Sequence, residues 1–265
     1  MDPRVLQHEV TGEGEPIVLV PGILSGWVSW IPHAERLAKT NRVVRVQPIH
    51  SELAVLGELP PPTFDWRTER ESLRLTLDEL GIDRADFAAW SGGGRAMIEF
   101  SARYPERVRT LTLIEPAAYW VVEQSDPDGR LPHWDPELTH RLARKRVTEE
   151  DLVEFLGRAG IGGGGDLRAM PQWPVWLQNR NALASDEVLG WPDRRIEALR
   201  SVTAPVLIVY GDVTEPWLQA CAVRLGELYP NARVVELPGD HACHIQSIDR
   251  FLDSFEKHTA TRSST

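Results

Sequence analysis

The segment Ala88–Gly94 places one serine, Ser91, among small residues. It follows an apolar run and opens a helical pattern, as a nucleophile elbow does. In such an elbow a serine occupies a strained turn, and small residues two positions before and after it let the helix approach the strand. Ala89 and Gly93 hold those positions. The start of the helix would also aim the N–H of Gly92 at a developing oxyanion, so the pattern predicts nucleophilic chemistry at Ser91.

Two other interpretations of this turn are open. A glycine-rich turn between a strand and a helix can simply cap the helix, with no chemistry at the serine. It can also hold a dinucleotide, but the G-x-G-x-x-G spacing is absent and the turn follows the third or a later strand. The nucleophile elbow is therefore the favoured interpretation, and helix capping is its alternative.

The turn at Ser91 needs a sheet to hold it in place. Short apolar runs that could form the strands of such a sheet recur along the chain. They span 17–20, 43–46, 87–90, 111–114, 206–210 and 234–237, after a first strand at Val5–Val10. Nearly continuous apolar runs are typical of strands covered on both faces. Helical patterns occupy 66–80, 94–103, 217–228 and 248–255. This alternation predicts a mostly parallel, doubly wound α/β sheet, and the turn at Thr11–Glu15 predicts an N-terminal hairpin.

The segment 119–198 breaks this alternation and contains no convincing strand. Helices are expected at Pro136–Arg144 and Thr148–Ala159, followed by the flexible run Gly162–Gly165. The segment holds five tryptophans: Trp120, Trp134, Trp173, Trp176 and Trp191. An insertion of this length in a sheet fold is usually a lid or a substrate-binding element. We therefore expect a core formed by 1–118 and 199–265, and a helical lid formed by 119–198.

Charge and composition exclude several classes of function. The chain of 265 residues carries a formal net charge of −10, so nucleic acid and anionic membrane surfaces are not expected as partners. Two cysteines, Cys221 and Cys243, make no disulfide scaffold, and no CxxC pair indicates a zinc site. No apolar stretch resembles a signal peptide or a membrane span. We expect a cytoplasmic protein, and a homodimer is compatible with the sequence.

Over nearly its whole length the chain resembles the α/β-hydrolase superfamily. The serine elbow, the loop Val20–Ile23 and the loop Leu237–His241 carry this resemblance. The resemblance implies that the backbone N–H of Ile23 is a second oxyanion donor beside the one after the serine. It also implies that His241 is the catalytic base, with His244 as the fallback.

The acid of the expected triad departs from the usual pattern of the family. The family most often carries it three residues past a glycine after the penultimate strand, where this chain has Thr214; Asp212 and Glu215 are out of register. A second placement in the family is the end of the strand after the nucleophile helix, where this chain has Glu115. A carboxylate buried there needs a partner, and His241 is the obvious one. We favour Glu115 over Asp212; alternatively, Glu115 only caps the first turn of the lid.

This combination is similar to a subset that includes the zearalenone-type lactone hydrolases. In that subset the acid is a glutamate after the same strand, and a lid segment with proline, valine and tryptophan supplies an aromatic wall, which Pro174–Trp176 matches. The expected substrate-binding residues are Trp176, Trp173, Trp90 and Gly22. The loop after the 43–46 strand departs from the family motif, so the substrate specificity of the family does not carry over to this chain.

The expected function is that of a serine hydrolase that cleaves an ester or lactone of a large apolar small molecule. Ser91, His241 and Glu115 would form an acyl-enzyme without a metal or cofactor, and Ile23 and Gly92 would form the oxyanion hole. The same groups could serve a C–C bond hydrolase, a perhydrolase or an acyltransferase. A ligand-binding protein with little turnover is the alternative from another class.

Overall fold

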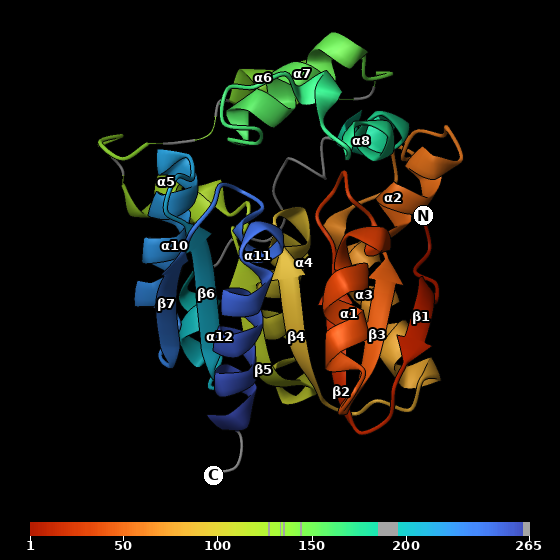
Figure 1. Cartoon of the computed structure of the whole chain (residues 1–265), viewed down its shortest axis with the longest axis vertical. Coiled ribbons are helices and arrows are strands. Elements are labelled where there is room, and N and C mark those ends of the chain that lie inside the picture. The colour runs from red at the N-terminus through yellow and green to blue at the C-terminus, as the bar shows by residue number, and fades with distance from the viewer. Residues whose placement is uncertain (127, 133, 135, 144, 185–195, 262–265) are drawn as a thin grey trace.

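The computed structural model describes residues 1–126, 128–132, 134, 136–143, 145–184 and 196–261. Trp191 and Arg144 of the expected lid segment lie outside the described residues. Seven strands form one sheet in the order β1-β3-β2-β4-β5-β6-β7 (Figure 1). Their bounds are β1 Gln7–Thr11, β2 Glu15–Val20, β3 Asn41–Gln47, β4 Ala85–Trp90, β5 Val108–Ile114, β6 Val206–Gly211 and β7 Ala232–Leu237. All neighbours pair in parallel except β1 with β3, which confirms the predicted sheet.

The predicted N-terminal hairpin is wrong. β1 pairs with β3, Gln7 opposite Gln47, and β3 separates it from β2. The turn at 11–15 therefore crosses the end of β3. Gly12 has φ 72°, and a Cβ there would lie 2.3 Å from the carbonyl oxygens of Ala38 and Asn41. β2 lies between β3 and β4, whereas β1 lies at the edge of the sheet, so the chain must pass the end of β3 to go from β1 to β2.

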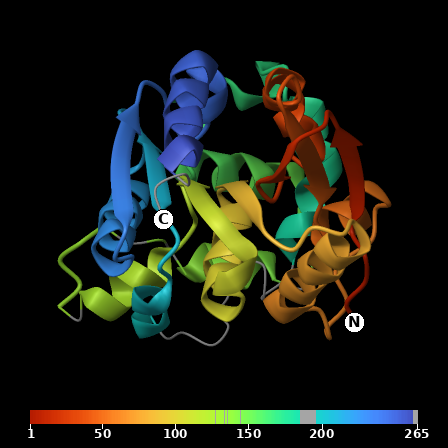
Figure 2. The same cartoon turned by 90° about the horizontal axis from the view of Figure 1, so that it is seen from below.

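Helices cover both faces of the sheet, as Figures 1 and 2 show. One face carries α1 (Ile31–Leu37) and α12 (Ile248–Ala260), whose apolar side chains join the core there. The other face carries α3 (Trp66–Glu79), α4 (Gly92–Arg103) and α10 (Pro216–Leu228). Asp65 caps α3 by accepting the Thr68 N–H at 3.0 Å. None of the described helices is long and apolar enough to cross a bilayer.

The chain between β5 and β6 contains no strand among its described residues. The α-helices among its described residues are α5 (Tyr119–Ser125), α6 (Pro136–Leu142), α7 (Glu149–Arg158) and α8 (Trp173–Asn179). Figure 1 shows α6, α7 and α8 beyond the carboxyl ends of the parallel strands. Thr148 and Asp151 form a reciprocal capping box at the start of α7. Apolar side chains of this segment belong to the same buried cluster as those of α4 and α10, so the segment is anchored to the core.

Two short helices complete the edge where the parallel strands end. Helix α2 (Ile49–Val55) follows β3, and α11 (Cys243–Gln246) follows β7 and precedes α12. The turns after β4, β5 and β7 reach the same edge because these strands run in parallel. Residues far apart in the sequence can therefore meet there.

Candidate active site

Ser91 occupies a strained turn between β4 and α4. Its φ is 54°, a left-handed value that is rare for a residue with a side chain. Its N–H donates to the carbonyl oxygen of Ile114 at 2.9 Å, and its own carbonyl oxygen accepts the N–H of Ala117 at 3.2 Å. A Cβ on Gly93 would lie 2.4 Å from the carbonyl oxygen of Pro21, so this position must be glycine. The turn is thus held by the strand beside it and by the loop after β2.

A chain of hydrogen bonds connects Ser91 to a buried carboxylate. Ser91 Oγ lies 2.9 Å from Nε2 of His241, and Nδ1 of His241 lies 3.2 Å from Oε2 of Glu115. Glu115 is fully buried, and His241 is 4% exposed. The indole N–H of Trp90 donates to the His241 carbonyl oxygen at 2.8 Å, which fixes the loop that carries the histidine. This order of groups is the one that activates a serine hydroxyl in acyl transfer.

Three donors surround the Glu115 carboxylate. Oε1 accepts the N–H of Gly211 at 2.6 Å, and Oε2 accepts the hydroxyl of Thr214 at 2.6 Å as well as the histidine ring. The backbone at Glu115 also has a left-handed φ of 45°, and its N–H donates to the carbonyl oxygen of Val209 at 2.8 Å. These hydrogen bonds satisfy both oxygens of the buried carboxylate. Thr214, which holds the usual acid position, here donates to the acid instead.

The alternative acid, Asp212, and the alternative base, His244, lie elsewhere. Asp212 is exposed and accepts the N–H of Gly239 at 2.9 Å. His244 is buried in an aromatic cluster, 4.7 Å from the Trp90 ring and 5.4 Å from the His33 ring. Burial holds the pKa of His244 well below its ordinary value. The described residues include no group of three or more His, Cys, Asp or Glu side chains that could hold a metal ion.

The two segments with the expected oxyanion donors meet beside the serine. A Cβ on Gly92 would lie 2.4 Å from Cγ1 of Ile23, and one on Gly22 would lie 3.4 Å from Cβ of Ser91. Both segments are buried at these positions. Backbone N–H groups at a helix start and in an adjacent loop are suited to hold a developing negative charge.

A cavity of about 30 Å³, partly open to solvent, lies beside the serine. Its lining residues are Ile23, Ser91, Arg95, Ala117, Tyr119, Trp134, Phe155, Ala159, Trp217 and His241. The rings of Trp134 and Trp217 meet edge to face, with centroids 5.0 Å apart. Their N–H groups donate to Thr139 Oγ1 and to the Arg158 carbonyl oxygen. With these polar edges engaged elsewhere, the two indoles present mainly apolar surface to the cavity.

The four residues expected to bind substrate are not among those that line this cavity. Gly22 lies next to Ser91, and Trp90 lies beneath His241. Trp173 and Trp176 are on α8, where Trp176 is buried. Sequence reasoning missed three lining residues that do carry a signal. Arg95 is one helical turn after the serine, Trp217 begins the helix after the Thr214 loop, and Trp134 precedes a predicted helix of the insertion.

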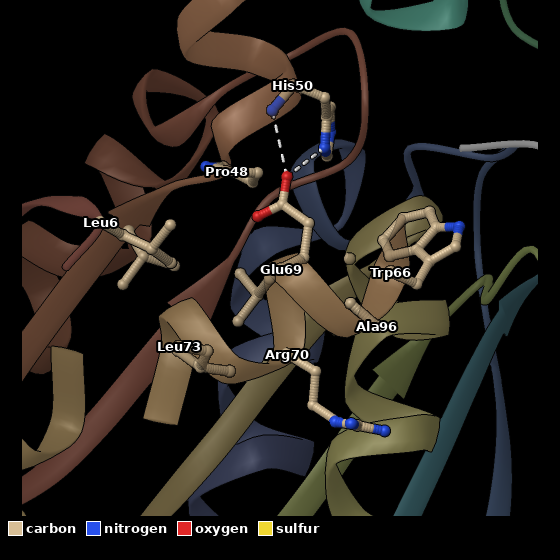
Figure 3. A pocket seen from close by; sticks show the side chains of 11 residues that line it. Leu6, Pro48, His50, Trp66, Glu69, Arg70, Leu73 and Ala96 are labelled. Atoms are coloured by element: carbon tan, nitrogen blue, oxygen red, sulfur yellow. Dashed lines mark hydrogen bonds and ion pairs between the residues drawn. The ribbon is translucent and has the colours of Figure 1, made fainter. Parts of the chain in front are cut away.

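A second cavity lies between α3, α4 and the loop after β3 (Figure 3). There Glu69 of α3 points toward the start of α2. Its carboxylate accepts the N–H of Ile49 at 3.1 Å, the N–H of His50 at 3.0 Å and Nδ1 of His50 at 2.7 Å. A buried carboxylate that receives the first N–H groups of a helix acts as its cap. The pair therefore anchors the loop after β3, the one that departs from the family motif.

Comparison with known proteins gives concordant results. A sequence profile described as "Alpha/beta hydrolase family" matches residues 17–254. RutD of Azorhizobium caulinodans is 32% identical over 41% of this chain, and the chain spans only 40% of the length of that relative. Esterase YbfF of Escherichia coli (strain K12) is 22% identical over 92% of each chain. A thermophilic esterase from Thermogutta terrifontis shares the fold, with TM-score 0.71 and 17% identity over 98% of this chain and 94% of that chain. Since the profile covers most of the sequence, the chain belongs to the alpha/beta hydrolase family.

Proposed function

We propose that this chain is a serine hydrolase that cleaves carboxylic esters, lactones among them, through an acyl-enzyme on Ser91. The observation that carries the proposal is the hydrogen-bond chain from Ser91 through His241 to the buried Glu115, at the wall of a cavity. Membership of the family and relatives named as esterases support it.

The first half-reaction acylates the serine. His241 Nε2 takes the proton of Ser91 Oγ as the oxygen attacks the ester carbonyl carbon. The N–H groups of Gly92 and Ile23 hold the resulting oxyanion, and each such donor is typically worth about 10²–10³ in rate. When the intermediate collapses, His241 returns the proton to the leaving alcohol. The products are the free alcohol and an ester between the acyl group and Ser91.

The second half-reaction releases the acid. His241 takes a proton from a water molecule, the hydroxide adds to the acyl carbon, and the proton returns to Ser91 Oγ as the ester bond breaks. In both halves Glu115 keeps Nδ1 protonated and stabilises the imidazolium. Thr214 and Gly211 hold the carboxylate in place while the charge on the ring changes. In a lactone the alcohol stays tethered to the acyl chain, so the cavity must hold the opened ring until deacylation.

The segment 119–198 acts as a lid in this proposal. It supplies Tyr119, Trp134, Phe155 and Ala159 to the cavity wall, opposite the elbow and His241. Aromatic walls favour flat or apolar groups on the substrate. The proposed reactant is thus a small molecule that carries a flat or apolar group.

The test is a panel of p-nitrophenyl esters of increasing acyl length together with lactones of increasing ring size. We expect turnover of at least one ester that Ser91→Ala lowers by about 10³ or more, with an unchanged melting temperature. Turnover that survives in Ser91→Ala, or no turnover of any ester or lactone by the folded wild type, would contradict the proposal.

A further inference from the structure

Two buried side chains from other parts of the chain hold the turn Gly22–Ser25, which carries the proposed oxyanion donor at Ile23. Nδ2 of Asn179 donates to the Leu24 carbonyl oxygen at 2.9 Å. The hydroxyl of Ser51 donates to the Ile23 carbonyl oxygen at 3.1 Å. Asn179 is 3% exposed and Ser51 is fully buried, so water does not compete for these carbonyl groups.

The Asn179 amide is connected to the oxyanion donor by two peptide units. A peptide unit is planar and trans, so its C=O and N–H point in opposite directions and turn together. The Leu24 carbonyl shares its peptide unit with the Ser25 N–H, and that N–H donates to the Gly22 carbonyl oxygen at 3.3 Å. The Gly22 carbonyl in turn shares its peptide unit with the Ile23 N–H. Two hydrogen bonds in series therefore lead from Asn179 to the proposed oxyanion donor.

Such a series affects both the direction and the strength of the last donor. The bond from Asn179 fixes the first peptide unit, and the first unit fixes the second through the bond within the turn. Hydrogen bonds in a chain also polarise one another, which makes the final N–H a better donor. Stabilisation of an oxyanion depends on donors that already point at the developing charge and need not reorganise during the reaction.

Packing alone does not explain an amide at position 179. Oδ1 of Asn179 is buried without a hydrogen-bond partner among the described residues. A leucine of similar shape would avoid the desolvation cost of that oxygen, so the bond from Nδ2 is the feature that favours asparagine. Asn179 ends α8, and α8 packs against α2, which carries Ser51 (Figure 1). Asn179 is not among the described residues that line the cavity beside Ser91.

We infer that Asn179 is a positioning residue for the oxyanion hole, which orients and polarises the Ile23 N–H through the Leu24 carbonyl. The inference rests on the proposed function. It makes the α8 part of the proposed lid contribute to transition-state stabilisation without touching the substrate. A group that acts only on the oxyanion affects kcat, whereas ground-state binding of the substrate stays the same.

The kinetic test replaces Asn179 by leucine, which has nearly the same shape and no donor. With a p-nitrophenyl ester, Asn179→Leu should lower kcat about tenfold or more, with KM within about twofold of the wild type. The loss should be smaller than the about 10²–10³ typical for complete removal of an oxyanion donor, because the Ile23 N–H remains.

The matched control is Asn181→Leu. Asn181 is equally buried, at 4% exposed, and its Oδ1 accepts the Val147 N–H at 3.2 Å, within the lid segment and away from the turn. Its replacement should lower the melting temperature and leave kcat within about twofold of the wild type.

An adduct with a trifluoromethyl ketone tests the oxyanion hole without turnover. Ser91 Oγ adds to the ketone carbon, its proton passes to Nε2 of His241, and the ketone oxygen becomes the oxyanion of a hemiketal. Fluorine NMR over a series of pH values gives the pKa of this hemiketal. That pKa should be higher by about 1 or more in Asn179→Leu than in the wild type, and unchanged in Asn181→Leu.

The outcomes separate the inference from the proposed function. Equal kcat and equal hemiketal pKa in the wild type and a folded Asn179→Leu would overturn the inference alone, as would a loss confined to KM. If the wild type hydrolyses no ester yet forms a hemiketal whose pKa depends on Asn179, the proposed function fails and the positioning role stands. Neither turnover nor an adduct with the folded wild type would overturn both. Should Asn179→Leu not fold, Asn179→Ala removes the same donor, and an unchanged hemiketal pKa there would overturn the inference.

Discussion

Replacing Glu115 by glutamine removes one charge and almost no volume, so it isolates the electrostatic role of this side chain. In the native site one carboxylate oxygen faces the Gly211 N–H, and the other faces Nδ1 of His241 at 3.2 Å. If the amide oxygen keeps the Gly211 contact, the amide NH2 faces Nδ1. Nδ1 must then lose its proton, and Nε2 carries the hydrogen toward Ser91, where it cannot act as a base. In the flipped orientation the amide NH2 would face the N–H of Gly211, so two donors would meet without an acceptor.

The expected loss follows from this tautomer. A histidine held in the wrong tautomer lowers kcat by about 10³–10⁴, which corresponds to about 4–5.5 kcal/mol of transition-state stabilisation. Asp212→Asn should change kcat by less than about threefold, because Asp212 is exposed and is bonded to the Gly239 N–H rather than to the histidine. The gap between the two variants therefore spans at least about two orders of magnitude.

The assay is steady-state hydrolysis of a p-nitrophenyl ester by both variants, with a melting curve for each. The melting curve separates lost catalysis from lost folding, since Glu115 is fully buried. An inactive Asp212→Asn beside an active, folded Glu115→Gln would refute the reasoning. It would require the loop after β6 to rearrange so that Asp212 reaches His241.

The remaining predictions concern the cavity, the loop after β3 and the buried histidines. Trp217→Ala should raise KM about tenfold or more, because it removes part of the cavity wall. Trp176→Ala, on α8, should mainly lower the melting temperature. The reverse pattern would place the substrate site near α8. Glu69→Ala should lower the free energy of unfolding in urea by about 3 kcal/mol, since three donors at the start of α2 lose their acceptor, and a loss below about 1 kcal/mol would contradict this. Burial lowers the pKa of His33 from 6.5 to about 4, so the unfolded chain takes up a proton first as the pH falls. The contribution of His33 to the free energy of unfolding is fully present above pH 6.5 and should fall by about 3 kcal/mol toward pH 4. The His33→Gln variant should therefore lose less stability than the wild type between these two pH values in urea titrations.

Local patterns made the sheet and the elbow predictable. Each buried strand carries its own apolar run, and the turn at Ser91 needs its small neighbours within five residues. The pairing of β1 was not predictable in this way, because it depends on which strand β3 lies beside in space. The contact of Glu115 with His241 was predictable because the family's usual position for the acid holds a threonine in this chain. The hydrogen bond from the Thr214 hydroxyl to the Glu115 carboxylate was not predictable, because it forms only where the two loops meet in space.

The cavity was harder to predict than the triad because its wall comes from the insertion. Trp134 and Trp176 are both tryptophans of that segment, and nothing in their sequence neighbourhoods says which one faces Ser91. That choice is made by the path of the chain between β5 and β6, which places Trp134 beside Trp217 in the cavity wall and Trp176 on α8.

The central claim is that Ser91 is the activated nucleophile, and covalent labelling tests it most directly. The folded protein is incubated with a fluorophosphonate and analysed by intact mass and peptide mapping. We expect one adduct, located on Ser91, that is absent in Ser91→Ala and forms at least about 10²-fold more slowly in His241→Ala. No adduct on the folded wild type, or an adduct at another residue that persists in Ser91→Ala, would contradict the account.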